Sequence, residues 1–281
     1  MLDRRASANK SDSLLSIKFI VFSQFGFTAL SALSTLFDLS ARQLPSQCRI
    51  CHTWPSLPIC ANCLGQFAVP CVRCDTCALP LPGPVIRCGV CLHTPPPLDA
   101  CLAAVSYAYP WSRLIADYKF GSQPALARIL ADLLRTVPGV LEAVHQASLL
   151  LPIPLSRERL QWRGYNQSLL LARELSGSKT RSDVLLRIRD TPIQHTLHRA
   201  ERLKSLHNAF ALEPGLAALV KDKRVVLIDD VMTSGASLDT AARVLRSGGA
   251  AHITGVVVAR TAAHEAIKNP AMPVNMRGLR G

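Results

Sequence analysis

The clearest signal along the chain is a set of short apolar runs separated by stretches of helical periodicity. Four runs predict buried strands, at residues 103–107, 149–153, 225–228 and 251–259. Apolar residues at helical spacing predict helices at 126–137, 169–175 and 238–245. Because strands alternate with helices, the sequence favours an α/β fold around a mostly parallel sheet.

The strand predicted at 225–228 leads into two acids and a hydroxyl-rich glycine turn before the next helix. There the free backbone N–H groups of 233–237 and the positive end of the helix dipole suit a phosphate dianion, which Gly235 lets the backbone approach. Asp229 and Asp230 can accept hydrogen bonds from two vicinal ribose hydroxyls. The turn predicts a ribose 5-phosphate site of Asp229, Asp230, Thr233, Ser234, Gly235, Ala236 and Ser237. The alternative is an ordinary strand, turn and helix whose acids only cap the helix.

Eight of the ten cysteines form four Cys-x-x-Cys pairs within one short segment. Each pair lets a tight turn direct two thiolates at one ion, and two pairs complete a tetrahedral structural Zn²⁺ site. The segment predicts two structural zinc ions, held by Cys48, Cys51, Cys60, Cys63, Cys74, Cys77, Cys88 and Cys91. A disulfide framework and redox-active pairs are the alternatives. The sequence leaves open whether consecutive pairs share an ion or the first pair joins the third.

These two signals divide the chain. Residues 46–98 form a small Cys-rich zinc-binding module, too short to bury a stable core without metal, and its three final prolines make a stiff break at 95–97. Residues 99–262 form the α/β domain. We expect 1–45 to be an extension with an amphipathic helix and 263–281 to be a disordered tail.

The amino-terminal residues 19–37 carry no charge and follow several basic residues, a pattern also found in signal anchors. Serine, threonine, glutamine and glycine interrupt this run, however. Over 28–45 a helical stripe suited to packing on a protein surface consists of Leu30, Leu33, Phe37, Ala41 and Leu44. We therefore expect a cytoplasmic protein that does not enter the membrane.

A formal net charge of +13 indicates anionic partners. Within 157–204, eleven basic residues stand against five acids, a density that could follow a nucleic acid backbone. A solvated basic face with a few diphosphate ligands explains them equally well. Three aromatic residues could stack bases: Trp162, Tyr165 and Phe210. The candidates for contact with nucleic acid or diphosphate are Arg159, Arg163, Gln167 and Arg202.

The acid pair and turn resemble the signature of type I phosphoribosyltransferases, in which four apolar residues precede two acids and a Thr/Ser-Gly-rich loop. With the cysteine pairs in front, the chain is similar to the ComF family. Further matching segments are 118–120, 152–154 with Arg159, 163–167, and Gln194 with Arg202 and 208–210, although Ser205 replaces an expected Asn. The resemblance implies a type I phosphoribosyltransferase-like fold that binds 5-phosphoribosyl 1-diphosphate with Mg²⁺, and a link to DNA uptake in natural competence.

Two functional classes follow from this resemblance. As a transferase, the chain would displace diphosphate from the anomeric carbon, with Lys119, Arg159 and Arg163 as candidate catalytic cations that stabilise the departing charge. As a binding protein, it would use the pocket to sense its ligand and the basic face to hold single-stranded DNA, together with competence or DNA-processing proteins. The sequence identifies neither a general base nor the acceptor.

Overall fold

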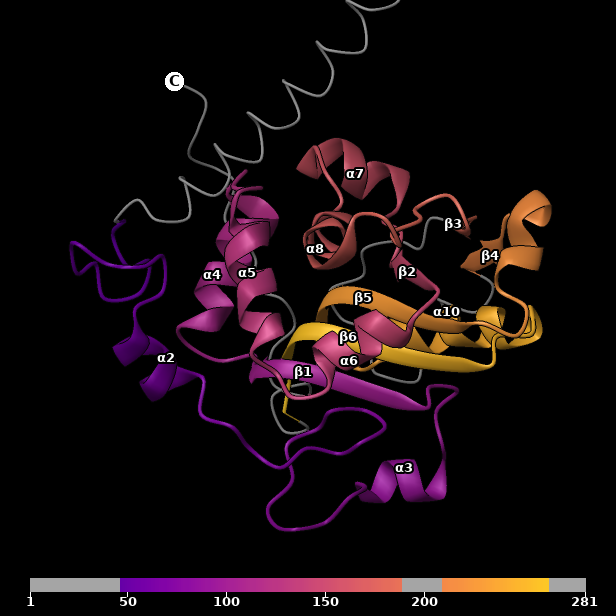
Figure 1. Ribbon diagram of the computed structural model, residues 1–281, viewed down its shortest axis with the longest axis horizontal. Coiled ribbons are helices and arrows are strands. Elements are labelled where there is room, and N and C mark those ends of the chain that lie inside the picture. The colour runs from indigo at the N-terminus through magenta and orange to yellow at the C-terminus, as the bar shows by residue number, and fades with distance from the viewer. Residues whose placement is uncertain (1–45, 189–208, 263–281) are drawn as a thin grey trace, which may run out of the picture. The chain divides into compact units, whose positions relative to one another are not determined.

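The computed structural model of the chain describes residues 46–188 and 209–262. Its centre is a four-stranded sheet whose strands lie in the order β1 (Ala100–Ser106), β6 (His252–Arg260), β5 (Arg224–Met232) and β2 (Leu149–Pro152). Neighbouring strands all run parallel. Figure 1 shows the two long central strands, β5 and β6, side by side beneath the helices. The predicted α/β fold around a mostly parallel sheet is confirmed.

One face of the sheet is covered by the last described helix. This helix, α10 (Ala236–Ser247), buries Leu238, Ala241, Ala242 and Leu245 in a single core cluster with β5 residues Val225 and Leu227. Because side chains alternate along a strand, Val226 and Ile228 point to the opposite face. There α5 (Leu126–Arg135) and α8 (Gln167–Ser176) pack on each other and on the sheet. Cover on both faces explains why the central strands are continuous apolar runs.

The helices predicted at 126–137, 169–175 and 238–245 correspond to α5, α8 and α10. Three further helices of the α/β region were not predicted: α4 (Trp111–Phe120), α6 (Val140–Gln146) and α7 (Arg157–Arg163). Two short helices lie in the cysteine-rich segment, α2 (Ala61–Phe67) and α3 (Gly89–His93), and a 3₁₀ turn η1 spans Pro214–Leu219.

Helix α7 is set by its two ends rather than by an apolar face. The backbone N–H of Arg159 donates to the Ser156 hydroxyl at 3.3 Å, which caps the first turn. Gly164 ends the helix in the left-handed conformation, with φ 77°. None of its residues is buried, so hydrophobic periodicity carries no signal for it.

A second, two-stranded sheet pairs β3 (Leu185–Arg187) with β4 (Phe210–Leu212) in antiparallel register. The residues between them, 189–208, lie outside the described part of the chain, and the predicted contacts at Gln194 and Arg202 lie there too. The same holds for the predicted amino-terminal helix at 28–45 and for the tail 263–281.

The structure falls into two compact units. Of the described residues, the smaller contains 46–48 and 52–58, in which Ser46 and Ser56 form an isolated antiparallel bridge. The larger contains 49–51, 59–188 and 209–262, and both sheets with their helices belong to it. Among the residues described in these units, no helix has the length and apolar character needed to cross a membrane.

Candidate phosphoribose site and metal centres

The acid pair lies in the carboxyl-terminal half of β5, which continues four residues past the predicted end of the strand at 228. Asp229 accepts hydrogen bonds at Oδ1 from the Ser168 hydroxyl at 3.0 Å and from the backbone N–H of Asp230 at 2.9 Å. The Asp230 carboxylate forms an ion pair with Lys119, whose Nζ lies 2.8 Å from its Oδ1. Both groups of this pair are largely buried, the side chains being 17% and 8% exposed. Each acid is therefore held in place by its own partner.

Burial raises the pKa of Asp229 to about 7, and the adjacent Asp230 charge adds to the rise. The positive charge of Lys119 and the hydrogen bonds from Asp230 and Ser168 offset part of it. The physical cause is that two carboxyl groups on neighbouring residues share a poorly solvated place. A ligand that brings hydroxyl donors or positive charge to this carboxyl group stabilises its ionised form.

The phosphate loop follows directly from β5. Gly235 takes the left-handed conformation, φ 84°, immediately before α10 begins at Ala236. A Cβ at this position would lie 2.7 Å from Met232 Cε, the movable end of a flexible side chain, so it is the left-handed backbone that favours glycine here. The Ala236 N–H lies 3.4 Å from the Ser234 hydroxyl, and Thr233 is exposed. This arrangement presents backbone donors and hydroxyls at the positive end of a twelve-residue helix.

Two other segments meet the acid pair, namely the end of α4 and the start of α8. The Tyr118 hydroxyl donates to the Gln167 carbonyl at 2.8 Å, and the Tyr165 hydroxyl donates to the Tyr118 carbonyl. These bonds fix the end of α4, which carries Lys119, against the start of α8, which carries Ser168. The segments 118–120 and 163–167 are thus brought together beside β5.

Arg163 and Gln167 form a polar pair in this corner. Arg163 donates to the Gln167 side-chain oxygen at 3.0 Å, while Arg163 Nε and Gln167 Nε2 are buried without a hydrogen-bond partner among the described residues. Burial lowers the pKa of Arg163, and the charges of Asp230 and Asp229 counteract the shift. Unsatisfied buried donors of this kind are expected where a ligand supplies the acceptor.

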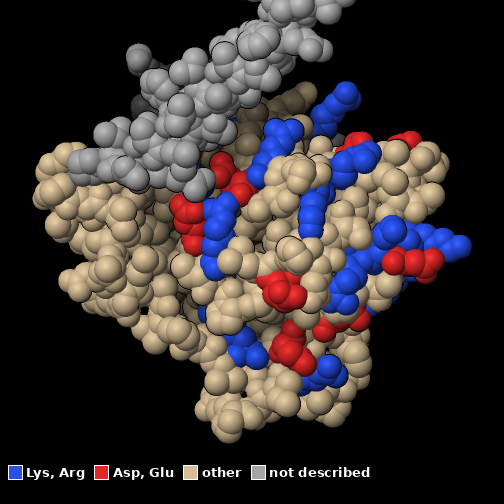
Figure 2. Space-filling view, in the orientation of Figure 1, with Lys and Arg blue, Asp and Glu red and all other residues tan. Residues whose placement is uncertain are grey.

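Two of the three arginines proposed to bind anions lie on α7. Arg159 lies in its first turn and Arg163 in its last, whereas Arg202 is outside the described residues. Figure 2 shows several Lys and Arg side chains gathered toward the part of this face where α7 lies, with acids between them. The prediction that Phe210 could stack on bases is wrong. Phe210 is only 3% exposed, and the Arg187 guanidinium lies over its ring, so it offers no free face.

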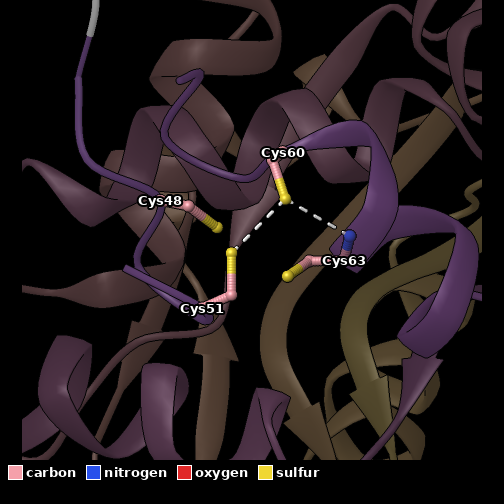
Figure 3. Close-up of side chains that lie close together, drawn as sticks. All are labelled: Cys48, Cys51, Cys60 and Cys63. Carbon is pink, nitrogen blue, oxygen red and sulfur yellow. Dashed lines mark hydrogen bonds between the residues drawn. The ribbon is translucent and has the colours of Figure 1, made fainter. Parts of the chain in front are cut away.

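The eight paired cysteines form two clusters of four. One contains Cys48, Cys51, Cys60 and Cys63, the other Cys74, Cys77, Cys88 and Cys91, and within each set all Sγ atoms lie within 4.8 Å of one another. Figure 3 shows the four thiols of the first cluster pointing toward one another. Consecutive pairs therefore share a site, which decides the question that the sequence left open.

Each cluster has the donors and the size for one Zn²⁺. Four thiolates about 2.3 Å from a tetrahedral ion lie about 3.8 Å apart. The Sγ atoms of Cys51 and Cys60 lie 3.6 Å apart, and those of Cys77 and Cys88 lie 3.7 Å apart, far from the roughly 2.05 Å of a disulfide. Burial raises the pKa of Cys74, but backbone hydrogen bonds from Cys88, Cys77 and Thr76 outweigh it and lower that pKa to about 7. Burial raises the pKa of Cys77 to about 11 and raises that of Cys91 as well, so the case for a metal rests on the spacing of the four thiols and not on these pKa values.

The second cluster is part of the core of the sheet. Its four cysteines belong to the same buried cluster as Leu227 of β5 and Leu238 of α10. Arg260, at the end of β6, is buried and donates to the Cys77 carbonyl at 2.8 Å, to the Met232 carbonyl at 3.0 Å and to the Thr233 carbonyl. Sequence reasoning missed Arg260; a charged residue closing an apolar strand was its only signal.

The sheet, the acid pair and the glycine loop together define a phosphoribosyltransferase-like domain. A family model described as "Phosphoribosyl transferase domain" matches residues 171–275, from α8 to beyond the end of β6.

Three relatives match a much larger part of the chain. The DNA utilization protein YhgH of Salmonella typhimurium is 33% identical over 232 residues, which cover 78% of this chain and 98% of that protein. The protein of the same name from Escherichia coli is also 33% identical, over 229 residues. Competence protein F of Haemophilus influenzae is 32% identical over 206 residues, 69% of this chain and 87% of that protein. The chain therefore belongs to the ComF family, whose members carry a phosphoribosyltransferase-like domain.

Proposed function

We propose that this protein binds 5-phosphoribosyl 1-diphosphate with Mg²⁺ and acts in DNA uptake or use. The observation that carries the proposal is the buried Lys119–Asp230 pair beside Asp229, directly followed by the phosphate loop. Asp229 and Asp230 accept hydrogen bonds from the ribose hydroxyls, and the loop 233–237 takes the 5-phosphate. The link to DNA rests on the relatives, which are named as DNA utilization and competence proteins.

We assign the diphosphate to the positively charged side chains near the acid pair. Lys119 and Arg163 lie on the acid side of the site, and Arg163 and Gln167 hold unsatisfied donors. Carboxylate oxygens also suit Mg²⁺, which supplies positive charge to the diphosphate when bound. Arg159, in the first turn of α7, is the third cation that we assign to the diphosphate.

Binding of this ligand is compatible with two alternative functions, which one assay distinguishes. A transferase displaces diphosphate at the anomeric carbon, and Lys119, Arg159 and Arg163 stabilise the leaving charge. A sensor holds the same ligand without turnover. Measured diphosphate release, with nucleobases and amines as acceptors, distinguishes them, because only a transferase releases diphosphate faster than the protein-free control.

Calorimetry tests the ligand assignment itself. Replacing Asp229 and Asp230 together with Asn should weaken binding of the Mg²⁺ complex at least tenfold, because each charge-assisted hydrogen bond contributes roughly 1.5–3 kcal/mol. Asp132→Asn is the matched control, since Asp132 is an exposed carboxylate on α5. Unchanged affinity in the double variant would remove the assignment.

Single-stranded DNA is the second proposed ligand, held by Arg159, Arg163, Gln167 and Arg202. If the arginines contact phosphates, changing all three to Ala lowers the slope of log affinity against log salt by about 0.7 for each contact. Arg243→Ala, an exposed arginine on α10, should leave the slope unchanged. The proposal includes a cytoplasmic location and competence or DNA-processing proteins as partners. An unaltered slope in the triple variant, with loss of diphosphate binding, would assign these residues to the small ligand alone.

The two cysteine clusters each hold one structural Zn²⁺ in this proposal. Residues 46–98 then form the zinc-binding module and 99–262 the phosphoribosyltransferase-like domain. The inclusion of the second cluster in the core of the sheet supports a structural rather than a catalytic role.

A further inference from the structure

Two large aromatic side chains lie exposed next to each other beside the phosphoribose site. Phe120, the last residue of α4, is 48% exposed, and Trp162 of α7 is 55% exposed. Their ring centroids are 5.5 Å apart with an angle of 43° between the planes. Side chains of this size normally remove most of their surface from water. An exposed pair in contact with each other offers a flat apolar surface to a planar ligand.

Arg163 adds a cation to the pair. Its guanidinium carbon lies 5.2 Å from the Phe120 ring centroid, and its Nη1 donates to Gln167 at 3.0 Å. Gln167 is itself 1% exposed, so it anchors the guanidinium from inside the protein. The Phe120 ring is thus held between fixed neighbours before any ligand arrives, and little side-chain freedom remains to be lost on binding.

The position of the pair relates it to the acids. Lys119, which binds Asp230, immediately precedes Phe120 in the chain. Arg157 and Arg159 lie on the same short helix as Trp162, and Glu158 is its one acid, so α7 carries a net positive charge next to the exposed rings. A flat apolar surface bordered by guanidinium groups matches a planar base joined to a phosphate backbone.

We propose that Phe120, Trp162 and Arg163 form a stacking surface for the unpaired bases of single-stranded DNA. The inference rests on the DNA binding proposed above and adds to it the part of the nucleic acid that is recognised. Aromatic faces accept every base because each base has a π surface, so the preference is for unpaired over paired strands rather than for a sequence. The Trp162 ring remains solvent-accessible, and its exposed face takes the base.

The test compares an oligothymidylate with an abasic strand of equal length and equal phosphate number. Fluorescence anisotropy of the labelled strands on the full chain should show that the intact strand binds roughly tenfold or more tightly. Trp162→Ala and Phe120→Ala should each remove most of this difference, whereas Trp162→Phe should retain it. Leu160→Ala, which removes another exposed apolar side chain of α7 (44% exposed), is the matched control.

The outcomes separate the inference from the function on which it rests. Equal binding of intact and abasic strands by the parent protein overturns the stacking surface but keeps a phosphate-binding face. Absence of binding to either strand overturns both. Loss of the difference in Leu160→Ala as well would show that α7 itself is disturbed and would also count against the surface. Trp162→Ala should keep its affinity for 5-phosphoribosyl 1-diphosphate. If free thymine quenches the fluorescence of Trp162 but does not compete with the strand for binding, the ring binds a base outside the strand site, which would contradict the proposal.

Discussion

The guanidinium of Arg260 donates through Nε to the carbonyl of Cys77, 2.8 Å away, across 183 positions of sequence. The same group bonds the carbonyls of Met232 and Thr233, where β5 becomes the phosphate loop. It is buried, and its guanidinium donates to four backbone carbonyls, the fourth being that of Thr261. One side chain therefore fixes the turn of a cysteine cluster and the entry to the loop at the same time.

Replacing Arg260 with Lys should disturb both sites. A lysine carries one point of positive charge and cannot reach four carbonyls in different directions. We expect a loss of roughly 2–4 kcal/mol in unfolding free energy, measured by denaturant titration, and weaker binding of 5-phosphoribosyl 1-diphosphate. Arg243→Lys is the control on an exposed position. Full stability with unchanged binding would mean that the carbonyls find other partners.

Gly235→Ala should weaken phosphate binding about tenfold or more. An alanine at φ 84° costs roughly 1–2 kcal/mol, and its Cβ would meet Met232 Cε at 2.7 Å. The Met232 methyl can move, but the strained backbone favours a shifted loop that presents its N–H groups less well to the phosphate. Calorimetry with ribose 5-phosphate measures the effect without the diphosphate. Gly215→Ala, in open space, should bind as the parent does; equal affinity in both variants would count against the loop as the phosphate site.

The pKa of Asp229, raised to about 7 from an ordinary value of 3.8, predicts a pH-dependent effect of Asp229→Asn. A carboxyl group that binds its proton more tightly when folded makes the fold less stable as the pH rises from about 4 to 7. The neutral Asn avoids this loss. The variant should melt several degrees above the parent at pH 8, and the gain should vanish toward pH 4. Thermal scans of Asp229→Asn and Asp132→Asn at both pH values check it; a gain independent of pH would contradict the origin proposed here.

Purified protein should contain about two Zn²⁺ per chain. Cys51→Ser and Cys88→Ser should each lose one equivalent, whereas Cys71→Ser, an exposed cysteine outside both clusters, should keep two. Cys88→Ser should lower the melting temperature more, because its cluster belongs to the core of the sheet. Metal analysis and thermal scans decide the point. One equivalent or none in the parent protein would return disulfides as the leading alternative.

The parts of the molecule that were predictable are those with a local signal. The apolar run 225–228 and the spacing of the cysteines depend on neighbours in sequence, and both led to the right class of structure. Helix α7 was missed because its signal is a serine cap at Ser156 and a glycine stop at Gly164 around seven residues, none of them buried. The role of Arg260 was missed because its partners are distant in sequence and come together only in the folded chain.

The position of β6 in the sheet determines when the core can form during synthesis of the chain. It is the last described strand to be synthesised, yet it lies between β1 and β5, so the core that surrounds the second cysteine cluster cannot close before residue 260 has left the ribosome. At about 5–20 residues per second, Cys77 waits on the order of ten seconds or more for Arg260. During that time its thiol is open to oxidation and to other metal ions. The unfinished chain, and not the folded protein, is therefore the stage at which the thiols of the second cluster are least protected.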